Sequence, residues 1–303
     1  MLAFWRIIKQ AALDFLNDNG VKFSAALSYY TIFSVGPVLV IIISLAGIFF
    51  GHEAVEGEVY AQINGLVGNS AAIQIQEIIQ NIEQSRLSTS GAVLGLVVLL
   101  VGATGIFTEI QDSINFIWSI KAKPKKGFLR FLFNRLISFS LIVSIGFLLL
   151  VTLIINALVE LLHDRLTAIF DEASVYIFTV INYGILLVVI TILFAVIFKV
   201  LPDAKVHWKD ALVGAVFTAI LFLIGKFLIG FYLRYSSIGV TYGAAASIML
   251  IMVWVYYTSI ILYFGAEFTK VYALRHGSGI EPDATAVFII KQEVKEMVYD
   301  TTH

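Results

Sequence analysis

Long apolar runs, each close to the length that crosses a lipid bilayer, alternate with polar segments along this chain. About 20 apolar residues in a helix span the hydrocarbon core. We predict six transmembrane helices, at about 29–50, 91–118, 136–159, 175–200, 211–233 and 242–267. The pattern indicates an all-α polytopic membrane protein, with residues 1–275 as the membrane domain and residues 276–303 as a cytoplasmic tail.

Polar regions outside the six runs also show helical periodicity. One face of the N-terminal segment is apolar and the other is charged, which predicts an amphipathic helix that lies at the headgroup level, packs on the domain, or does both. The apolar face consists of Phe4, Trp5, Ile8, Ala12, Phe15 and Leu16. Charged residues interrupt this segment, so a cleavable signal peptide is not expected.

Two further helical regions are expected on the surface of the protein. Residues 52–90 combine isoleucines at helical spacing with mostly acidic charges, and we interpret them as a helical cap on the outer face. In the tail, we expect a soluble helix from Ala284 to Tyr299.

The second predicted span carries an unusual polar row. Thr104, Thr108, Gln111 and Asn115 recur at helical spacing on one side. If the helix enters the hydrocarbon near residue 91, Thr104 lies about 20 Å deep. Polar groups at that depth need partners, so this row indicates where function is located.

Two other features could belong to the same polar path. Gly36 and Pro37 interrupt the first span, which is consistent either with a simple kink or with a broken helix lining a binding site. Lys226 lies about 22 Å along the fifth span, where it either snorkels to the interface or contacts an anionic group. Our hypothesis for a substrate path comprises Lys226, Gly36, Pro37, Thr104, Thr108, Gln111 and Asn115.

Glycines in the fifth span predict close helix packing. Gly214, Gly225 and Gly230 thin one region of this span. Because lipid supplies no hydrophobic drive between helices, small residues favour association by letting backbones approach. We expect the contact within one subunit, and a dimer seam is the alternative.

Charged residues gather near the predicted inner membrane boundary. We interpret them as a collar of ion pairs that fixes helix ends, and a cytoplasmic gate or a proton-linked site is the alternative. The collar comprises Glu109, Asp112, Arg135, Lys199 and Glu267.

Composition and charge narrow the class of protein. Apolar residues make up 59% of the chain and charged residues 14%, which excludes a soluble globular protein. The absence of cysteine excludes disulfides and thiolate metal sites, and no GxxxxGK[ST] phosphate-binding loop is present. Basic residues crowd alternate loops, so both termini are expected in the cytoplasm. One basic loop is expected to contact anionic lipid through Lys121, Lys123, Lys125, Lys126 and Arg130.

Four stretches resemble the motifs of the YihY/virulence factor BrkB family of bacterial inner-membrane proteins, in the family's order, over about residues 3–275. They are SAALSYYTIFSVGP, GIFTEIQDSINFIW, LPDAKVHWKDALVGA and YGAAASIMLIMVWVYYTSIILYFGAEFTKVY. The resemblance implies a six-span protein of the bacterial cytoplasmic membrane. The family has also carried a ribonuclease label. That activity is disfavoured here, because the five histidines stand in separate segments without ligand spacing.

We therefore expect a transporter or lipid-handling protein without an ATPase of its own, and not an enzyme. Expected partners are membrane lipids and an anionic small-molecule or lipid substrate, with no nucleic acid, cofactor or metal. The alternative is a non-transporting scaffold for envelope assembly, whose outer cap makes the contact.

Overall fold

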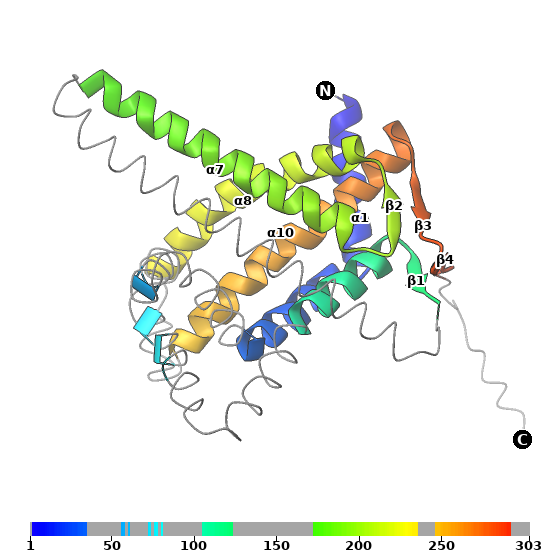
Figure 1. The fold of residues 1–303 in the computed structure, drawn as a ribbon, viewed down its shortest axis with the longest axis horizontal. Helices are drawn as coiled ribbons and strands as arrows, with labels where there is room; N and C mark the ends of the chain where they lie inside the picture. Colours follow the sequence, from blue (N-terminus) through cyan, green and yellow to red (C-terminus); the bar gives the residue numbers. More distant parts are fainter. Residues whose placement is uncertain are drawn as a thin grey trace, which may run out of the picture.

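The computed structural model describes residues 2–34, 56–57, 60, 72–73, 76–77, 80, 105–123, 172–235 and 246–291. Long helices dominate this part of the chain (Figure 1). The labelled helices are α1 (Leu2–Asn17), α7 (Glu172–Val200), α8 (Trp208–Tyr235) and α10 (Ala246–His276), and residues 20–34 and 105–117 are also helical. The helical class is confirmed for the described residues, to which four short strands are added.

The later predicted spans coincide with observed helices. The spans at 175–200 and 211–233 lie within α7 and α8, and α10 covers most of the span at 242–267. By length and composition, α8 and α10 could each cross a membrane, over Trp208–Tyr232 and Ile248–His276. The described parts of the first two spans are helical. The span at 136–159 and most of the cap at 52–90 lie outside the described residues.

The N-terminal helix α1 packs along α10. Ile7 and Ala11 of α1 are buried against Phe268 and Val271 of α10. Trp5 points away from this contact and is 65% exposed. The prediction that this helix packs on the domain is therefore confirmed. Apolar side chains on the opposite side of α1 stay exposed, as expected for a helix that also lies at the headgroup level.

A tight turn separates α1 from the helix at 20–34. Asn19 has a φ of 61°, in the left-handed region that asparagine tolerates better than most residues. At Gly20, a Cβ atom would overlap the ring of Phe15, so glycine allows the ring to pack closely against this turn. The turn places Asp18 between the two helices.

Two short antiparallel sheets join distant segments. Strand β1 (Ile120–Ala122) pairs with β4 (Ala286–Phe288), and β2 (Ala204–Val206) pairs with β3 (Ile280–Pro282). The expected helix from Ala284 to Tyr299 is therefore wrong for residues 284–291. The backbone there is satisfied by β1 and its flanks instead, as in the 2.8 Å hydrogen bond from Ile289 N to Ser119 O.

The strands gather the ends of several helices at one side of the molecule. Strand β1 follows the helix at 105–117, β2 connects α7 to α8, and β3 and β4 follow α10 (Figure 1). The backbone of Asp283 in the tail also donates to Asp203 O at 3.0 Å. One end of each of these helical segments therefore lies on the same side of the molecule. The connecting strands β1 to β4 cover this side, which we call the shared end.

Helices α8 and α10 interlock through glycine and threonine. A Cβ atom on Gly214 of α8 would overlap Thr269 of α10, and one on Gly265 of α10 would overlap Thr218 of α8. Each threonine hydroxyl donates to the carbonyl of the glycine one turn earlier on its own helix, at 2.7 Å. The prediction of close packing is confirmed at Gly214.

The other two glycines of the fifth span differ from each other. Gly225 lies against Tyr257 and Ile261 of α10, where a Cβ atom would meet side-chain atoms at 2.7 and 2.8 Å. At Gly230, a Cβ atom would meet no heavy atom within 4 Å among the described residues. Close packing thus holds at Gly225, whereas the described structure gives Gly230 no such contact.

Candidate functional site

Polar side chains meet where the helices share one end, and the pair Asn115 and Asp203 is central. Asn115 Nδ2 donates to Asp203 Oδ2 at 2.9 Å, and Asp203 N donates to Asn115 Oδ1 at 2.8 Å. Gln111, one turn earlier, adds a 3.2 Å hydrogen bond to the same carboxylate. Asn115 is buried. Two members of the predicted polar row therefore hold the loop that follows α7.

A second contact fixes the same helix to α10. The Nε1 atom of Trp118 donates to Ala266 O at 3.0 Å, and the indole is buried. A buried indole N–H without a partner would be costly, so this bond sets where the segment meets α10. Segments 105–118, 201–215 and 264–272, which carry the motif resemblance, thus touch one another.

Further polar side chains of the helix at 105–117 and of α10 are buried near these contacts. Ser113 donates to Glu109 Oε1 at 3.3 Å, and Ser113 is buried. Within the described part of the chain, the Tyr263 hydroxyl and Glu267 Oε1 are buried without a hydrogen-bond partner. They lie one turn apart on α10, in the membrane-length run of that helix. Buried polar groups without a partner are rare, because burial removes their hydrogen bonds to water and no protein hydrogen bond replaces them.

Two carboxyl and two ammonium groups form a compact cluster beside them. Lys270 Nζ lies 3.2 Å from both Asp18 Oδ2 and Glu267 Oε2, and Lys291 Nζ lies 2.6 Å from Asp18 Oδ2. The Glu267 side chain is 0% exposed. Lys291 also donates to Ile117 O at 3.4 Å. The cluster therefore links the turn after α1, the helix at 105–117, α10 and the tail.

The electrostatics of this cluster differ between its two outer members. Burial acts to raise the pKa of the Asp18 carboxyl, but the hydrogen bond from Lys291 and the charge of Lys270 outweigh it and hold the pKa below its ordinary value. For the Lys291 ammonium, burial is the largest effect and lowers the pKa, although contact with Asp18 opposes it. Asp18 is therefore the stable anion of the cluster.

The predicted path residues are spread over the molecule. Thr108 is exposed, whereas Gln111 and Asn115 bind Asp203. Lys226 is half-buried, well along α8 from the shared end, and among the described residues it has no hydrogen bond or ion pair. Three predicted residues lie outside the described part: Gly36, Pro37 and Thr104.

The predicted collar residues do not pair with one another in the described part of the chain. Glu109 contacts Ser113, Asp112 is exposed, and Lys199 donates to Val206 O. Glu267 pairs with Lys270, three residues later on α10. Arg135 lies outside the described residues, as do Lys125, Lys126 and Arg130 of the predicted lipid-contact loop, whereas Lys121 and Lys123 are exposed.

Three central residues of this end were not among the predicted site residues. Asp18 follows α1 and precedes Asn19 and Gly20, a signal for a helix end rather than for an ion cluster. Asp203 lies in a Leu-Pro-Asp sequence that reads as a turn. Lys291 is one of two lysines in a polar tail, and no local pattern indicates its long-range partner.

Comparison with known proteins identifies similar chains. The family model described as virulence factor BrkB matches residues 11–288. A UPF0761 membrane protein of Azotobacter vinelandii is 28% identical over 88% of this chain and 62% of its own length. One of Saccharophagus degradans is 27% identical over 98% and 67%, and one of Vibrio vulnificus is 26% identical over 84% and 78%. This chain thus spans less than two thirds of the Azotobacter relative's length. No solved structure matches this chain.

Proposed function

Because this chain belongs to the virulence factor BrkB family of membrane proteins, we propose that it is a transporter or lipid-handling protein of the bacterial cytoplasmic membrane. The substrate would be an anionic or amphipathic molecule of the cell envelope. The chain contains no GxxxxGK[ST] loop, so the process would be passive, driven by an ion gradient, or powered by a partner. On this proposal, it acts without enzymatic chemistry of its own.

We propose six membrane spans with both termini in the cytoplasm. The charge pattern predicts that the N-terminus, the loops near residues 120 and 200 and the tail lie on one side of the membrane. Contacts within the described chain support that grouping. Strand β1 pairs with β4 of the tail, β2 pairs with β3, and Asp18 near the N-terminus binds Lys291 of the tail. Segments in direct contact lie on the same side, and segments rich in lysine and arginine stay cytoplasmic.

The observation that carries the proposal is the fully buried carboxyl group of Glu267. One of its oxygens lies 3.2 Å from Lys270 and, within the described residues, the other has no hydrogen-bond partner. An ionisable group in a membrane-length helix that is only half satisfied is a functional-site candidate by default. We propose that Glu267 exchanges partners or a proton as the helices rearrange during transport.

The proposed substrate contact lies further along α8. Lys226 is half-buried beside apolar side chains that are strongly exposed, including Phe227 at 60% and Phe231 at 67%. A cation at the edge of an apolar surface suits an anionic headgroup whose acyl chains remain in lipid. The proposed path from Lys226 would follow the polar row of the second span, past the interruption that the sequence predicts at Gly36 and Pro37.

Transport in proteoliposomes tests the proposal. The full chain is reconstituted, and the movement of labelled anionic phospholipid, neutral phospholipid and small anions is followed with and without a proton gradient. We expect the wild type to accelerate an anionic probe, and Lys226→Met to reduce that rate about tenfold or more. Lys209→Met, at an exposed lysine of the same helix, is the matched control and should leave the rate unchanged.

Each failure has a distinct meaning. If the wild type accelerates no probe under any gradient, transport is wrong and a scaffold role replaces it. If Lys226→Met transports normally at normal expression, the contact at Lys226 is wrong while transport stands. Glu267→Gln tests whether transport is coupled to protons. If Glu267 is proton-linked, this variant should still move the probe passively, but its rate should no longer depend on the proton gradient.

A further inference from the structure

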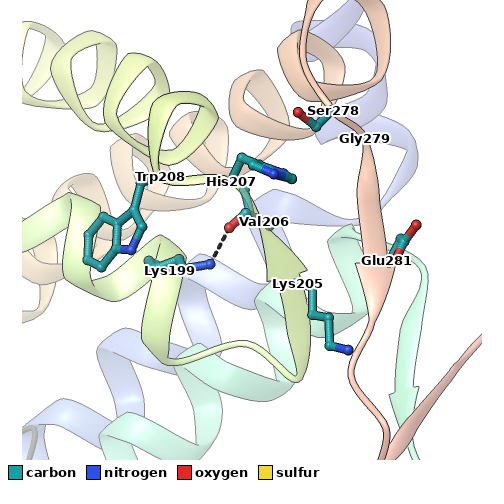
Figure 2. A pocket seen from close by; sticks show the side chains of 8 residues that line it. All are labelled: Lys199, Lys205, Val206, His207, Trp208, Ser278, Gly279 and Glu281. Atoms are coloured by element: carbon teal, nitrogen blue, oxygen red, sulfur yellow. Dashed lines mark hydrogen bonds between the residues drawn. The ribbon is translucent and has the colours of Figure 1, made fainter.

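A pocket opens beside the strands β2 and β3. It has a volume of about 330 Å³ and lies between the end of α7, the start of α8 and the segment that joins α10 to β3. Figure 2 shows the side chains that line it, among them Lys199, Lys205, His207, Trp208 and Glu281. None of these residues belongs to the ion cluster around Asp18.

The pocket wall has more basic than acidic side chains. The lining includes two ammonium groups and an imidazole but one carboxylate, that of Glu281. Lys199 gives one hydrogen bond to Val206 O and has further N–H groups to donate. Lys205 lies opposite Glu281 in the strand register, yet no ion pair joins Lys205 to any residue in the part of the chain that the structure describes. The wall therefore offers cationic donors that protein groups have not saturated.

The pocket lies at a depth where lipid headgroups are expected. The apolar run of α8 begins at Trp208, whose side chain is 53% exposed, and Lys199 stands in the last turn of α7. Exposed tryptophan at the end of a membrane-length helix is typical of the interface. The Lys199 ammonium also lies 5.9 Å from the Trp208 ring centroid, within cation–π range. An aromatic ring and a cation thus stand together at the predicted headgroup level.

We propose that this pocket binds a phosphate group, carried either by an anionic phospholipid or by a soluble phosphate compound. Phosphate oxygens accept hydrogen bonds from ammonium and imidazole groups, and basic pockets at the cytoplasmic ends of transmembrane helices suit anionic headgroups. This site is separate from the proposed transport path, and it stands whether or not the chain transports anything.

Two backbone amides at the pocket already have partners within the protein. The amide of Ser278 donates to the buried carboxylate of Asp210 at 3.0 Å, and the amide of Gly279 donates to Ala273 O at 3.0 Å. Both are therefore already engaged. Binding is accordingly expected to follow the lysine charges and to weaken as salt is added.

The test follows tryptophan fluorescence of the full chain in a neutral detergent, with Trp208 as the reporter. The probes are short-chain phosphatidylglycerol, short-chain phosphatidylcholine and inorganic phosphate. We expect a saturable change with phosphatidylglycerol, none with phosphatidylcholine, and loss of the change in Trp208→Phe. The double variant Lys199→Gln/Lys205→Gln should weaken the apparent affinity about tenfold or more.

Controls separate charge in the pocket from overall charge and from misfolding. Lys209→Gln removes an exposed lysine that does not line the pocket, and it should bind within about twofold of wild type. The charge-retaining variant Lys199→Arg/Lys205→Arg should bind, which shows that loss in the glutamine variant is not misfolding. Competition by inorganic phosphate with the same variant dependence assigns the site to soluble phosphates, and binding of the lipid alone assigns it to headgroups. The proposal is overturned if the glutamine double variant binds normally or if Lys209→Gln loses as much affinity as that variant. It is also overturned if neither phosphate probe changes the fluorescence.

Discussion

Asn115 and Asp203 are 88 residues apart in sequence and exchange two hydrogen bonds, side chain to side chain and backbone to side chain. The side-chain amide of Asn115 accepts from the Asp203 backbone with its oxygen and donates to the Asp203 carboxylate with its nitrogen. The pair therefore fixes the loop after α7 to the helix at 105–117. Because β2 directly follows this loop, the pair also helps to position β2 and the pocket beside it.

Replacing Asn115 tests how much this pair stabilises the protein. Asn115→Leu removes both bonds and leaves the Asp203 amide and carboxylate with fewer partners, so the free energy of unfolding should fall by about 2 kcal/mol or more. Gln111→Ala, which removes one 3.2 Å bond from a part-buried side chain, should cost about 1 kcal/mol or less. Denaturant unfolding in detergent measures both. Equal losses in the two variants would show that the reciprocal pair has no special role.

The interlock of α8 and α10 predicts opposite results at two glycines of one helix. Gly214→Ala places a methyl group onto Thr269, so it should destabilise the protein by about 1–3 kcal/mol. Gly230→Ala meets open space among the described residues and should be neutral or stabilise by up to about 1 kcal/mol, because alanine favours a helix over glycine. Thermal unfolding of the pair measures this. A stabilised Gly214→Ala variant would contradict the close packing.

The pKa of Asp18 predicts a pH dependence of stability. Because the folded chain holds this pKa below its ordinary value of 3.8, the carboxylate stabilises the fold above that pH. The contribution is lost as the pH falls below 3.8 and through the folded pKa. Asp18→Asn should therefore unfold at lower temperature than wild type at pH 7, by a difference that corresponds to about 2 kcal/mol.

The difference between Asp18→Asn and wild type should close as the pH falls below 3.8. Asp14→Asn is the control, because the Asp14 side chain accepts a hydrogen bond from Gln10 of its own helix and has no ion pair among the described residues. It should change stability by about 0.5 kcal/mol or less at every pH. A gap between Asp18→Asn and wild type that stays constant from pH 7 to pH 3 would contradict the role of the ionised Asp18.

Lys291 is expected to hold the tail to the membrane domain. Its ammonium binds Asp18 at 2.6 Å and lies 4.4 Å from the centroid of the Phe116 ring. With a side chain 26% exposed, Lys291→Gln should cost only about 1 kcal/mol of global stability. Limited proteolysis after residue 276 should nevertheless become faster. Lys121→Gln, at an exposed lysine of β1, is the control, and equal cleavage of the two variants would rule out the anchor.

The helices were predictable from sequence where apolar residues run without interruption. Residues in α7 and α8 are apolar over most of their length, and the predicted spans at 175–200 and 211–233 fall within them. Helical hydrogen bonds are local, so composition over a window decides them. The span at 136–159 lies outside the described residues and stays a prediction.

The strands and the ion cluster could not be predicted, because their partners are distant in sequence. Strand β4 has three residues and becomes a strand only through β1, so local propensity in the tail indicated a helix. Similarly, the sequence placed Glu267 near other charges at the inner boundary, but Asp18 and Lys291 enter its surroundings only through the turn after α1 and the folded tail.

The polar row of the second span illustrates the same limit. Sequence periodicity placed Gln111 and Asn115 on one side of a helix, and their shared contact with Asp203 agrees with that placement. Periodicity does not reveal which element approaches that side. The role of the row in a substrate path remains a prediction that the transport measurements address.

The paired notches of α8 and α10 have a mechanical consequence. Thr269 fills the space over Gly214 while Thr218 fills the space over Gly265, so the two helices are keyed to each other in both directions. Sliding one helix past the other by a turn would drive each threonine out of its notch and into a bulkier side chain. We therefore expect these two helices to move together, and under the proposed transport function a hinge would lie outside their contact.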